Sequence, residues 1–548
     1  MTGFVLKFKM EIFNDVEILR LAEVHAKLDK KMSTYGTAGF RAKAVDMDHI
    51  FFRMGLFATL RSMCKKATIG IMVTASHNPE DDNGIKLIDP LGEMLEEKWE
   101  EYATKLVNVG NECIIKELSK IVKNENIDVS QQASLFLARD TRPSGLVLSQ
   151  AVKDGISAMG GICKDFGLLT TPQLHYIVFK HNSGETASED AYNMDFSTAF
   201  KNLVGIGTGT LTVDCANGVG AQKLKKISEK LSGSSLELVI CNDDGPNSGK
   251  LNDKCGADYV KVQQCAPVKL DMKPWQRYAS FDGDADRIVY YTLDDDCNFV
   301  LIDGDKIAAL FCLFIKDCLD LAGVDVKLGI VQTAYANGSS TNYLSEKLGV
   351  AVHCARTGVK HLHHMAQDFD IGVYFEANGH GTILVKETCQ KAIDDASKNS
   401  SLSDEQREAV KKLKNFLLII NQTVGDAICD MLAVEAILSV KQWTVSDWCN
   451  LYKEFPNRQR KVAVADRTVI ETYDSERRVS KPEGLQIAID ELVKQYPLSR
   501  SFVRPSGTED VVRVYAESDT QEHADALAEK VCLAVSKFAG GVTKSLKS

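Results

Sequence analysis

Short apolar runs alternate along this chain with longer stretches in which apolar residues recur every three or four positions. A short apolar run between turn residues is typical of a buried strand, and the longer spacing is typical of an amphipathic helix. The pattern predicts strands at residues 69–73, 135–138, 211–214, 236–241, 288–291, 328–331, 351–354, 371–375, 462–465 and 511–515. It predicts helices over roughly the first 30 residues and at 49–65, 96–107, 112–122, 146–158, 223–231 and 522–538, with a solvated helix pair at 391–415. We interpret the polar run at 182–193 as a surface excursion.

The order of these elements divides the chain into blocks. Three strand–loop–helix blocks follow one another, and a smaller α+β block ends the chain of 548 residues, a length that suits three or four domains. We therefore predict an α/β fold of three successive mixed-sheet domains and a smaller C-terminal α+β domain. The predicted bounds are residues 1–200, 201–301, 302–445 and 446–548. Ligands of open α/β sheets bind outside the carboxyl ends of the strands, where most polar loops of this chain fall.

Composition and charge narrow the class of protein. Hydrophobic residues make up 44% of the chain and charged residues 26%, which are ordinary globular values. The net charge of −10 argues against nucleic-acid binding but leaves room for a locally positive pocket that holds a small anion. No apolar run approaches the roughly 18–20 residues of a membrane span, and the first residues do not resemble a secretory signal. Because the 15 cysteines show no paired spacing, we predict a reduced, cytoplasmic protein without a membrane partner or an obligatory protein partner.

The segment Val73-Thr74-Ala75-Ser76-His77-Asn78-Pro79 carries the first candidate for chemistry. The preceding apolar run delivers the Ser76 hydroxyl into a turn that Asn78-Pro79 closes, and Lys86 follows ten residues after the serine. A serine at the end of a buried strand is a candidate nucleophile or phosphate carrier. Taken by itself, the same serine is also compatible with a helix cap or a local backbone hydrogen bond.

Three aspartates alternate with small residues in Asp282-Gly283-Asp284-Ala285-Asp286-Arg287. An extended backbone at this spacing places the three carboxylates on one side, where they require a cation, Mg²⁺ before Ca²⁺. An EF-hand is excluded because the sixth position is Arg287 instead of glycine and the twelfth is Leu293 instead of glutamate. An isolated acidic turn is the remaining alternative.

Two later loops suggest recognition of a phosphorylated sugar. Arg504-Pro505-Ser506-Gly507-Thr508, with Arg513 nearby, offers a guanidinium fork, hydroxyls and backbone N–H groups to an anion. Glu376-Ala377-Asn378-Gly379-His380 offers groups for sugar hydroxyls, or general acid–base catalysis by His380. An ordinary surface turn is the alternative for both loops. The run Lys360-His361-Leu362-His363-His364 lacks the nearby ligands that would complete a zinc site.

Taken in their order along the chain, these four motifs resemble those of the α-D-phosphohexomutase superfamily over almost the whole sequence. Further stretches are similar to its eukaryotic members that interconvert N-acetylglucosamine 6-phosphate and N-acetylglucosamine 1-phosphate. They are residues 35–41, 168–176, 376–382 and 502–517. One position departs from the superfamily, because some bacterial relatives carry a histidine where this chain has Val359 and Lys360. The general acid–base residue is therefore not transferred from the resemblance.

The resemblance implies four domains around a central cleft and a phosphoserine isomerase of UDP-N-acetylglucosamine biosynthesis. It implies one Mg²⁺ per active site, held by phosphorylated Ser76, Asp282, Asp284 and Asp286, and a hexose bisphosphate as activator. The sugar-contacting residues would be Glu376, Ala377 and Asn378. The substrate phosphate that is not transferred would be held by Arg504, Pro505, Ser506, Gly507, Thr508 and Arg513. The active-site cations would be Arg41, Lys86 and Arg287.

Three other functions compete with this interpretation. A glucose- or mannose-phosphate mutase would share the chemistry and differ around the loop at 376–382. A sugar-phosphate-binding protein without turnover would not need Ser76 and the three aspartates. A Mg²⁺-dependent phosphatase that uses Ser76 would release more phosphate than it transfers.

Overall fold

The computed structural model describes residues 13–27, 31–204, 209–234, 236–243, 249–506 and 510–541. The chain forms two compact units. The first consists of Met1–Leu301 and Leu418–Ser439, and the second of Ile302–Leu417 and Val440–Ser548. Among the described residues, the first unit contains two five-stranded sheets, and the second contains a four-stranded sheet, a three-stranded sheet and a two-stranded hairpin.

The first sheet of the first unit has the strand order β1-β3-β2-β4-β5. Its strands are β1 (Phe40–Lys43), β2 (Ile69–Val73), β3 (Asp82–Ile88), β4 (Ser134–Arg139) and β5 (Ile162–Leu168). Strands β2, β4 and β5 run parallel, whereas β3 pairs antiparallel with β2 and with β1. The carboxyl ends of β2 and β4 therefore lie side by side at one edge of the sheet.

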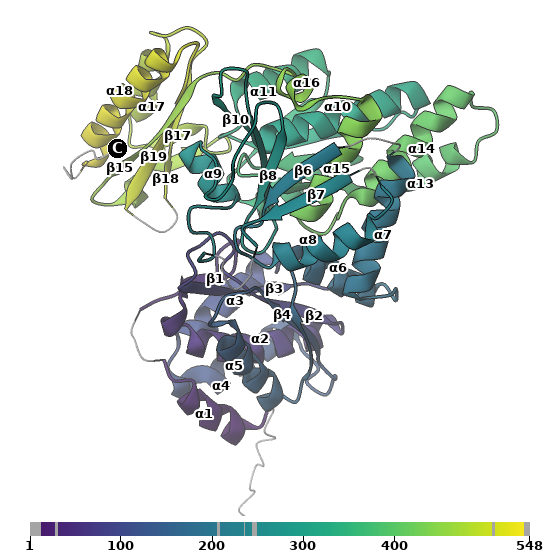
Figure 1. Ribbon diagram of the computed structural model, residues 1–548. Coiled ribbons are helices and arrows are strands. Elements are labelled where there is room, and N and C mark those ends of the chain that lie inside the picture. The colour runs from purple at the N-terminus through teal and green to yellow at the C-terminus, as the bar shows by residue number, and fades with distance from the viewer. Residues whose placement is uncertain are drawn as a thin grey trace, which may run out of the picture. The chain divides into compact units, whose positions relative to one another are not determined.

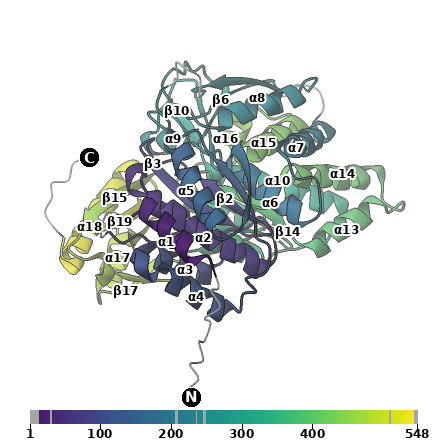
Figure 2. The same ribbon diagram turned by 90° about the horizontal axis from the view of Figure 1, so that it is seen from below.

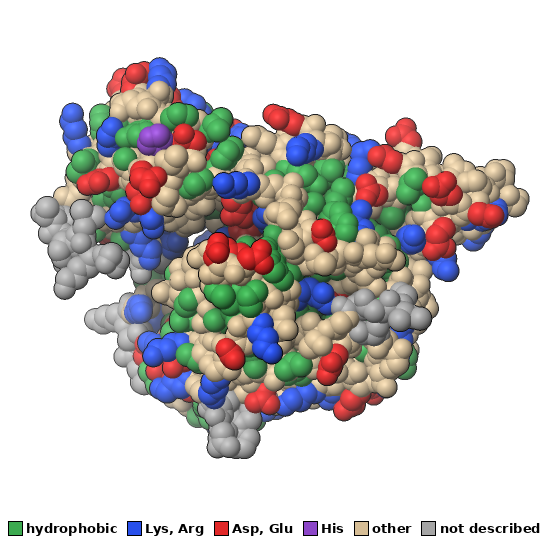
Figure 3. Space-filling view, turned by 45° about the horizontal axis from the view of Figure 1, so that its top comes forward, with side chains coloured by type: hydrophobic (Ala, Val, Ile, Leu, Met, Phe, Trp, Pro, Cys, Tyr) green, Lys and Arg blue, Asp and Glu red, His purple; other side chains and the backbone are tan. Residues whose placement is uncertain are grey.

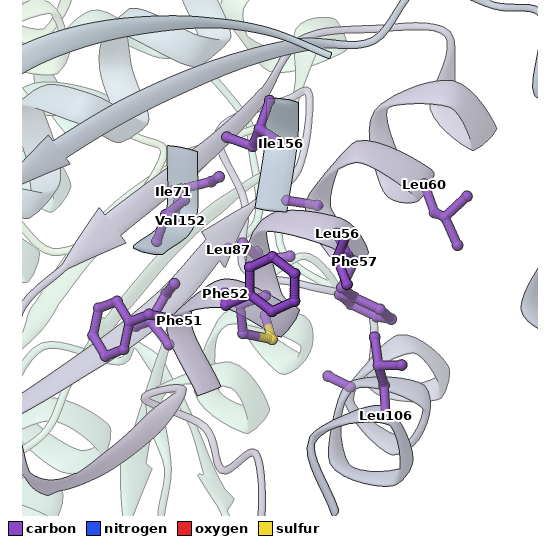
Figure 4. Packing of buried hydrophobic residues seen from close by; sticks show 14 of the residues in the cluster. Phe51, Phe52, Leu56, Phe57, Leu60, Ile71, Leu87, Leu106, Val152 and Ile156 are labelled. Atoms are coloured by element: carbon purple, nitrogen blue, oxygen red, sulfur yellow. The ribbon is translucent and has the colours of Figure 1, made fainter. Parts of the chain in front are cut away.

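Helices cover both faces of this sheet. Every residue from 49 to 63 of α2 (Asp48–Lys65) is buried, and α2 packs against α5 (Gly145–Ala158) in Figure 2. Figure 4 shows the resulting core, in which Ile71 of β2 and Phe52 of α2 belong to one cluster. The opposite face contacts α6 (Thr171–Asn182), because a Cβ at Gly70 would lie 2.8 Å from the side chain of Val178. Outside this sandwich lie α1 (Asp15–Val24), α3 (Glu97–Asn108) and α4 (Ile114–Glu125).

A second sheet of the first unit has the order β10-β9-β8-β6-β7. Its strands are β6 (Gly209–Asp214), β7 (Leu236–Cys241), β8 (Arg277–Phe281), β9 (Ile288–Leu293) and β10 (Phe299–Ile302). Strands β6, β7 and β8 run parallel and β9 antiparallel to β8. The accompanying helices are α7 (Glu189–Leu203), α8 (Gly220–Lys230), α9 (Ala257–Gln263) and most of α15 (Ala427–Lys441).

The second unit begins with a sheet of order β12-β11-β13-β14. Its strands are β11 (Leu328–Thr333), β12 (Ala351–Ala355), β13 (Ile371–Phe375) and β14 (Gly381–Val385). Its helices are α10 (Gly304–Ala322), α11 (Gly338–Asn342), α12 (Val359–Ala366), α13 (Glu387–Ser397), most of α14 (Asp404–Ile419) and α16 (Val445–Cys449).

The C-terminal part of the second unit is a small α+β arrangement (Figure 1). Its sheet has the order β15-β19-β18, formed by β15 (Asn457–Ala463), β18 (Arg500–Pro505) and β19 (Val511–Glu517). A hairpin of β16 (Glu471–Tyr473) and β17 (Arg478–Lys481) stands beside it. The helix α18 (Gln521–Ala539) packs on β15 and β19 and also contacts α17 (Leu485–Val493).

The predicted α/β class is confirmed, and each predicted strand corresponds to a strand of the structure. Two element predictions were wrong in part. The N-terminal helix spans only Asp15–Val24 among the described residues, and α7 starts at Glu189 within the polar run that we interpreted as a surface excursion. The bounds of four domains, their central cleft and the cytoplasmic location stay predictions.

Acidic and basic side chains are interspersed over the face of the protein drawn in Figure 3, so neither sign dominates that face. Among the described residues, no helix combines the length and the apolar character needed to cross a bilayer.

Candidate active site

Ser76 lies just after β2, in a turn whose backbone is unusual for a serine. The Asn78 N–H donates a hydrogen bond to the Ala75 carbonyl at 3.0 Å, which closes the turn. The φ angle of Ser76 is +54°, in the left-handed region that residues with a side chain rarely adopt, and the side chain is buried. The Ser76 N–H donates to the Thr74 hydroxyl at 2.9 Å, and this bond stabilises the unusual conformation.

Two side chains from other segments hold the Ser76 carbonyl. Arg142 Nη2 and Asn252 Nδ2 each donate a hydrogen bond to this oxygen at 2.9 Å. Arg142 is fixed by Asp140, whose Oδ2 accepts from Arg142 Nε at 2.9 Å and from the Thr74 hydroxyl at 2.7 Å. Because Arg142, Asp140 and Thr74 are buried and bonded to one another, they keep the backbone of Ser76 in one orientation.

Three carboxylates converge on the Ser76 hydroxyl. Ser76 Oγ lies 3.0 Å from Asp282 Oδ2, 2.7 Å from Asp284 Oδ1 and 3.5 Å from Asp286 Oδ1. One oxygen from each carboxylate lies within 4.8 Å of the others, the one such group of three among the described residues. Burial and the neighbouring charges of Asp286 and Asp284 raise the pKa of Asp282 well above its usual range. Buried carboxylates and a hydroxyl oxygen in this arrangement suit a hard divalent cation such as Mg²⁺.

The backbone of this acidic loop differs from the extended segment that we predicted. Residues 283–285 form a turn, which the Ala285 N–H closes by donating to the Asp282 carbonyl at 3.1 Å. Asp282 Oδ1 also accepts from the N–H groups of Asp286 at 3.1 Å and Arg287 at 3.2 Å. An aspartate that bonds the following backbone favours a turn over a strand, which is why the extended prediction was wrong. The carboxylates converge because the turn folds them together.

Basic side chains lie beside the three carboxylates. Lys86 Nζ lies 3.3 Å from Asp284 Oδ2 and 3.5 Å from Asp286 Oδ2. Arg287 Nε lies 3.9 Å from Asp282 Oδ2 and from Asp286 Oδ1. These cations offset part of the negative charge of the loop, and they are also suited to a phosphate group on the serine.

Arg41 and His77 complete the charged surroundings. Burial lowers the pKa of Arg41, while the Asp284 carboxylate acts in the opposite direction. Arg41 Nε is buried and has no hydrogen-bond partner among the described residues. A buried donor of this kind needs an explanation, and an anionic ligand supplies one. Burial and the positive charges of Arg287 and Arg41 lower the pKa of His77 to about 2, so its imidazole is neutral.

The predicted sugar loop connects β13 and β14 in the second unit. Glu376 Oε2 accepts a hydrogen bond from Asn378 Nδ2 at 3.2 Å, and Asn378 Oδ1 accepts from the His380 N–H at 3.0 Å. The loop rests on the start of α10, where a Cβ at Gly304 would lie 2.0 Å from the Glu376 carbonyl oxygen. Gly304 also donates its N–H to the Ala377 carbonyl at 3.4 Å. The loop is therefore held in one shape by its own side chains and by the helix beneath it.

Arg504 and Arg513 lie directly opposite each other on β18 and β19 of the second unit. Two like charges in this position destabilise a sheet, and a bound anion between them removes that repulsion. Arg513 Nε is buried without a hydrogen-bond partner among the described residues. Pro505 ends β18, and the Ser506 N–H donates to a carbonyl of β19 at 2.9 Å. The two remaining residues predicted for this loop, Gly507 and Thr508, lie outside the described residues.

Comparisons with known proteins identify the family. Two matching family models are described as phosphoacetylglucosamine mutase AMG1, domain II (residues 185–289) and domain III (residues 303–443). Two others are described as phosphoglucomutase/phosphomannomutase, the alpha/beta/alpha domain I (residues 42–112 and 101–192) and the C-terminal domain (residues 461–534). Phosphoacetylglucosamine mutase of Sus scrofa is 54% identical over 527 residues, which cover 94% of this chain and 96% of that protein. The chain belongs to the phosphoacetylglucosamine mutase family.

Other phosphoacetylglucosamine mutases agree with this assignment. The Homo sapiens enzyme is 53% identical over 534 residues, covering 96% of this chain and 98% of that protein. A crystal structure of the Aspergillus fumigatus enzyme with GlcNAc-6P and magnesium matches with a TM-score of 0.92 and 46% identity, over 96% of this chain and 99% of that one. The chain is thus an isomerase of the phosphohexomutase type, and the resemblance drawn from its motifs is confirmed.

Sequence reasoning missed several residues that contact this mutase site. The Thr171 hydroxyl donates to Asp284 Oδ2 at 2.6 Å, and the Thr171 N–H donates to the Asp284 carbonyl at 3.2 Å. Arg142 and Asn252, which hold the Ser76 carbonyl, were not predicted either. Thr171 lies within the stretch 168–176 that resembles the family, and that resemblance was the available signal. The roles assigned to individual residues by resemblance stay predictions.

Proposed function

We propose that Ser76 carries the phosphoryl group through which this enzyme interconverts N-acetylglucosamine 6-phosphate and N-acetylglucosamine 1-phosphate, by way of a bisphosphate intermediate. The observation that carries the proposal is the convergence of three carboxylates on the Ser76 hydroxyl, two of which also pair with Lys86. A serine that only capped a helix or bonded the local backbone would need none of these partners. The product would serve UDP-N-acetylglucosamine biosynthesis.

Two phosphoryl transfers give the net reaction. In the first, the bond between Ser76 Oγ and phosphorus breaks and a bond forms between phosphorus and the sugar O1, while O1 gives up its proton and Ser76 Oγ takes one up. The bisphosphate then reorients. In the second transfer the bond between O6 and phosphorus breaks and the phosphoryl group returns to Ser76 Oγ, while Ser76 Oγ gives up its proton and O6 takes one up. We assign His380, a buried imidazole on the sugar loop, to accept the proton from O1.

The residues suited to one Mg²⁺ are Asp282, Asp284 and Asp286 together with an oxygen of phosphorylated Ser76. The cation would supply charge stabilisation to the transferring phosphoryl group. Lys86, Arg287 and Arg41 would add to this stabilisation from the protein side.

Recognition of the rest of the substrate falls to the second unit. Glu376, Ala377 and Asn378 would contact the sugar, and the arginine pair Arg504 and Arg513 would hold the phosphate that is not transferred. Pro505, Ser506, Gly507 and Thr508 would complete that phosphate site. Because guanidinium groups and backbone N–H groups recognise phosphate without reading the sugar, one site can hold either phosphate of the intermediate.

Structures of the Aspergillus fumigatus relative support this chemistry. One holds GlcNAc-6P and magnesium. Another, of a serine-to-alanine variant, holds glucose 1,6-bisphosphate and matches this chain with a TM-score of 0.91 and 46% identity, over 96% of this chain and 99% of that one. We carry the substrate class, the metal and a hexose bisphosphate activator over to this chain as part of the proposal.

An isomerisation assay with Mg²⁺ and a trace of hexose bisphosphate tests the proposal. N-acetylglucosamine 6-phosphate should be preferred over glucose 6-phosphate, and Ser76→Ala should lose nearly all activity. Ser130→Ala is the matched control, because among the described residues the exposed Ser130 side chain bonds only to Asp128 of its own turn. Covalent phosphate should be detected on the wild type by mass spectrometry and be absent from Ser76→Ala.

Each contrary result has a defined meaning. Full activity in Ser76→Ala would remove the serine from the reaction. Preference for glucose 6-phosphate would keep the mechanism and change the substrate, and phosphate release in excess of isomerisation would indicate a phosphatase.

A further inference from the structure

The turn of the β16–β17 hairpin has a conformation that proteins rarely retain without a reason. Its three residues Asp474, Ser475 and Glu476 are all left-handed, with φ angles of +53°, +54° and +68°. Each such residue is strained, and it persists where the surroundings determine its conformation. The Ser475 hydroxyl donates to the Cys354 carbonyl at 2.7 Å, which fixes the turn against the end of β12.

The turn places the Glu476 carboxylate between two segments of the candidate site. Glu476 Oε1 accepts a hydrogen bond from Arg504 Nε at 3.0 Å. Glu476 Oε2 accepts from the Thr357 N–H at 2.9 Å and from the Thr357 hydroxyl at 2.7 Å. The exposed fractions of the Arg504 and Glu476 side chains are 21% and 15%, so solvent screens this ion pair only in part.

Thr357 connects this carboxylate to the sugar loop. The next residue, Gly358, donates its N–H to Glu376 Oε1 at 3.2 Å. One chain of hydrogen bonds thus runs from Arg504 through Glu476 and the backbone at Thr357 to Glu376. The Glu476 carboxylate accepts three hydrogen bonds without any ligand, so it has a stable position of its own.

A phosphate at Arg504 would meet a carboxylate that already engages the same guanidinium. Two anions on one cation compete, because each repels the other over a few ångströms in partly desolvated surroundings. The Thr357 hydrogen bonds hold the Glu476 carboxylate beside Arg504, and they would still do so with a phosphate bound. In that case Glu476 would weaken the binding of phosphate by its charge and not by blocking access.

We propose that Glu476 is a positioning residue that competes with the substrate phosphate for Arg504. This competition lets the bisphosphate leave the phosphate site and reorient between the two phosphoryl transfers. This inference rests on the proposed function, in which one phosphate site holds each end of the intermediate in succession. If the phosphate were bound equally strongly in every bound state, KM would fall without a rise in kcat. Here such binding would also slow the reorientation of the bisphosphate.

Glu476→Gln tests the inference with little change of shape. The amide oxygen still accepts from Thr357, whereas the amide nitrogen offers Arg504 a donor in place of an anion. Inorganic phosphate is the probe, measured by calorimetry, together with kcat and KM on N-acetylglucosamine 6-phosphate. We expect phosphate to bind tighter by roughly tenfold, KM to fall and kcat to fall. A residue that merely supported the fold would weaken phosphate binding when substituted.

Two controls accompany this variant. Arg478 of the same hairpin donates a hydrogen bond to the Asp490 carboxylate at 2.8 Å. Asp490→Asn removes that negative charge and should change neither phosphate affinity nor kcat. Glu476→Ala loses the Thr357 hydrogen bonds as well as the charge, and should still tighten phosphate binding. Thermal unfolding verifies that each variant is folded.

The Arg504→Ala background separates this inference from the proposed function. If Arg504 grips phosphate, Arg504→Ala weakens phosphate binding, and adding Glu476→Gln then has no further effect. Unchanged phosphate affinity in Arg504→Ala would contradict the proposed role of Arg504 itself. Weaker or unchanged phosphate affinity in Glu476→Gln would overturn the competition, and tighter binding with an unchanged kcat would overturn its link to turnover.

Discussion

At the scale of single residues, the candidate site is built around a serine that departs from ordinary backbone geometry. A left-handed φ at a residue with a side chain costs on the order of 1–3 kcal/mol and is retained where neighbouring groups determine it. Ser76 has three such determinants: the Thr74 hydroxyl at its N–H, and Arg142 and Asn252 at its carbonyl. The conformation turns the hydroxyl toward the aspartates, so the strain is part of how the site is made.

Thr171 is expected to tune the metal site without being a ligand. Its hydroxyl donates to Asp284 Oδ2, and groups that orient ligands in this way typically change metal affinity by roughly 10–100-fold. Thr171→Val should therefore require more Mg²⁺ for half-maximal activity, with a smaller loss of kcat at saturating Mg²⁺. The measurement is the rate of isomerisation against Mg²⁺ concentration.

A matched threonine tests whether this effect belongs to the metal site. Thr210→Val removes a hydroxyl that contacts Glu237 at the surface, at 3.1 Å, and should leave the Mg²⁺ dependence as in the wild type. If Thr171→Val shows the same Mg²⁺ dependence as this control, Thr171 does not orient Asp284.

His77 is expected to stay out of the proton transfers although it adjoins Ser76. Because its pKa is lowered to about 2, the imidazole is neutral throughout a pH profile measured between about pH 5.5 and 8. The pH dependence of kcat/KM reports groups of the free enzyme that titrate in the measured range. His77→Asn should therefore keep both limbs of the profile at their wild-type pH, even if the rate changes. A limb that moved or vanished between about pH 5.5 and 8 would show that His77 titrates there.

At the scale of elements, a histidine connects the end of the N-terminal helix to two other helices. His25, which follows α1, lies 2.8 Å from Asp48 of α2 through Nδ1 and 3.1 Å from Asp154 of α5 through Nε2. The hydrogen bond to Asp48 raises the pKa of His25 above its ordinary value, although burial opposes this shift. The ring also stacks on Phe52, with centroids 5.0 Å apart.

This contact should make the stability of the first unit depend on pH. Because the folded pKa is raised, the stabilisation is fully present below the ordinary pKa of about 6.5 and is lost as the pH rises through the folded value. The free energy involved is about 1 kcal/mol or less, since the Asp48 side chain is 42% exposed and solvent screens the pair. His25→Gln should lower the unfolding temperature more at pH 6 than at pH 8.5. An equal loss at both values would mean that the histidine contributes by packing alone.

Strands with a clear local pattern of apolar residues could be predicted from the sequence. Strands that are stabilised mainly by pairing with their neighbours in the sheet could not. β2 and β13 are buried apolar runs between turn residues, and both were predicted. β3 was not, because its pattern is interrupted by Asn83 and Lys86, and it is a strand through its pairing with β1 and β2. The same reason hid Arg142: the parallel pairing of β4 beside β2 brings the loop after β4 to Ser76, and no single-sequence pattern shows which strands are neighbours.

At the scale of the whole molecule, the chain does not complete one compact unit before starting the next. Residues 418–439 return to the first unit after the chain has built the sheet of β11 to β14 in the second. Every residue from 427 to 438 in α15 is buried, so this helix has no solvated face and no amphipathic pattern from which its packing partner could be predicted. The predicted domain bounds at 302–445 treat this segment as part of the third block.

The return of this segment should make a fragment that ends at residue 301 unable to fold. Asp426, just before α15, accepts a hydrogen bond from the Tyr192 hydroxyl at 2.8 Å, and Glu435 of α15 lies 3.1 Å from Arg277. The Ala427 N–H also donates to the Ala285 carbonyl in the acidic loop at 3.1 Å. Large apolar side chains of the helix are buried as well, and the burial of each contributes roughly 1.5–3 kcal/mol to the stability of the fold. Their combined loss is comparable with the stability of a whole domain, about 5–15 kcal/mol.

Two matched fragments test this dependence. Residues 1–301 alone should be poorly soluble and show no cooperative thermal transition, whereas residues 1–301 joined by a Gly/Ser linker to residues 418–439 should melt cooperatively. A third fragment, with Asp426→Ala and Glu435→Ala in the appended segment, separates the polar contacts from apolar burial and should melt at a lower temperature. Because the acidic loop contacts α15 through Ala285, we also expect the repaired fragment to bind Mg²⁺ more tightly than the unrepaired one. Cooperative melting of residues 1–301 alone, at the temperature of the repaired fragment, would show that α15 only rests on a unit that is already complete.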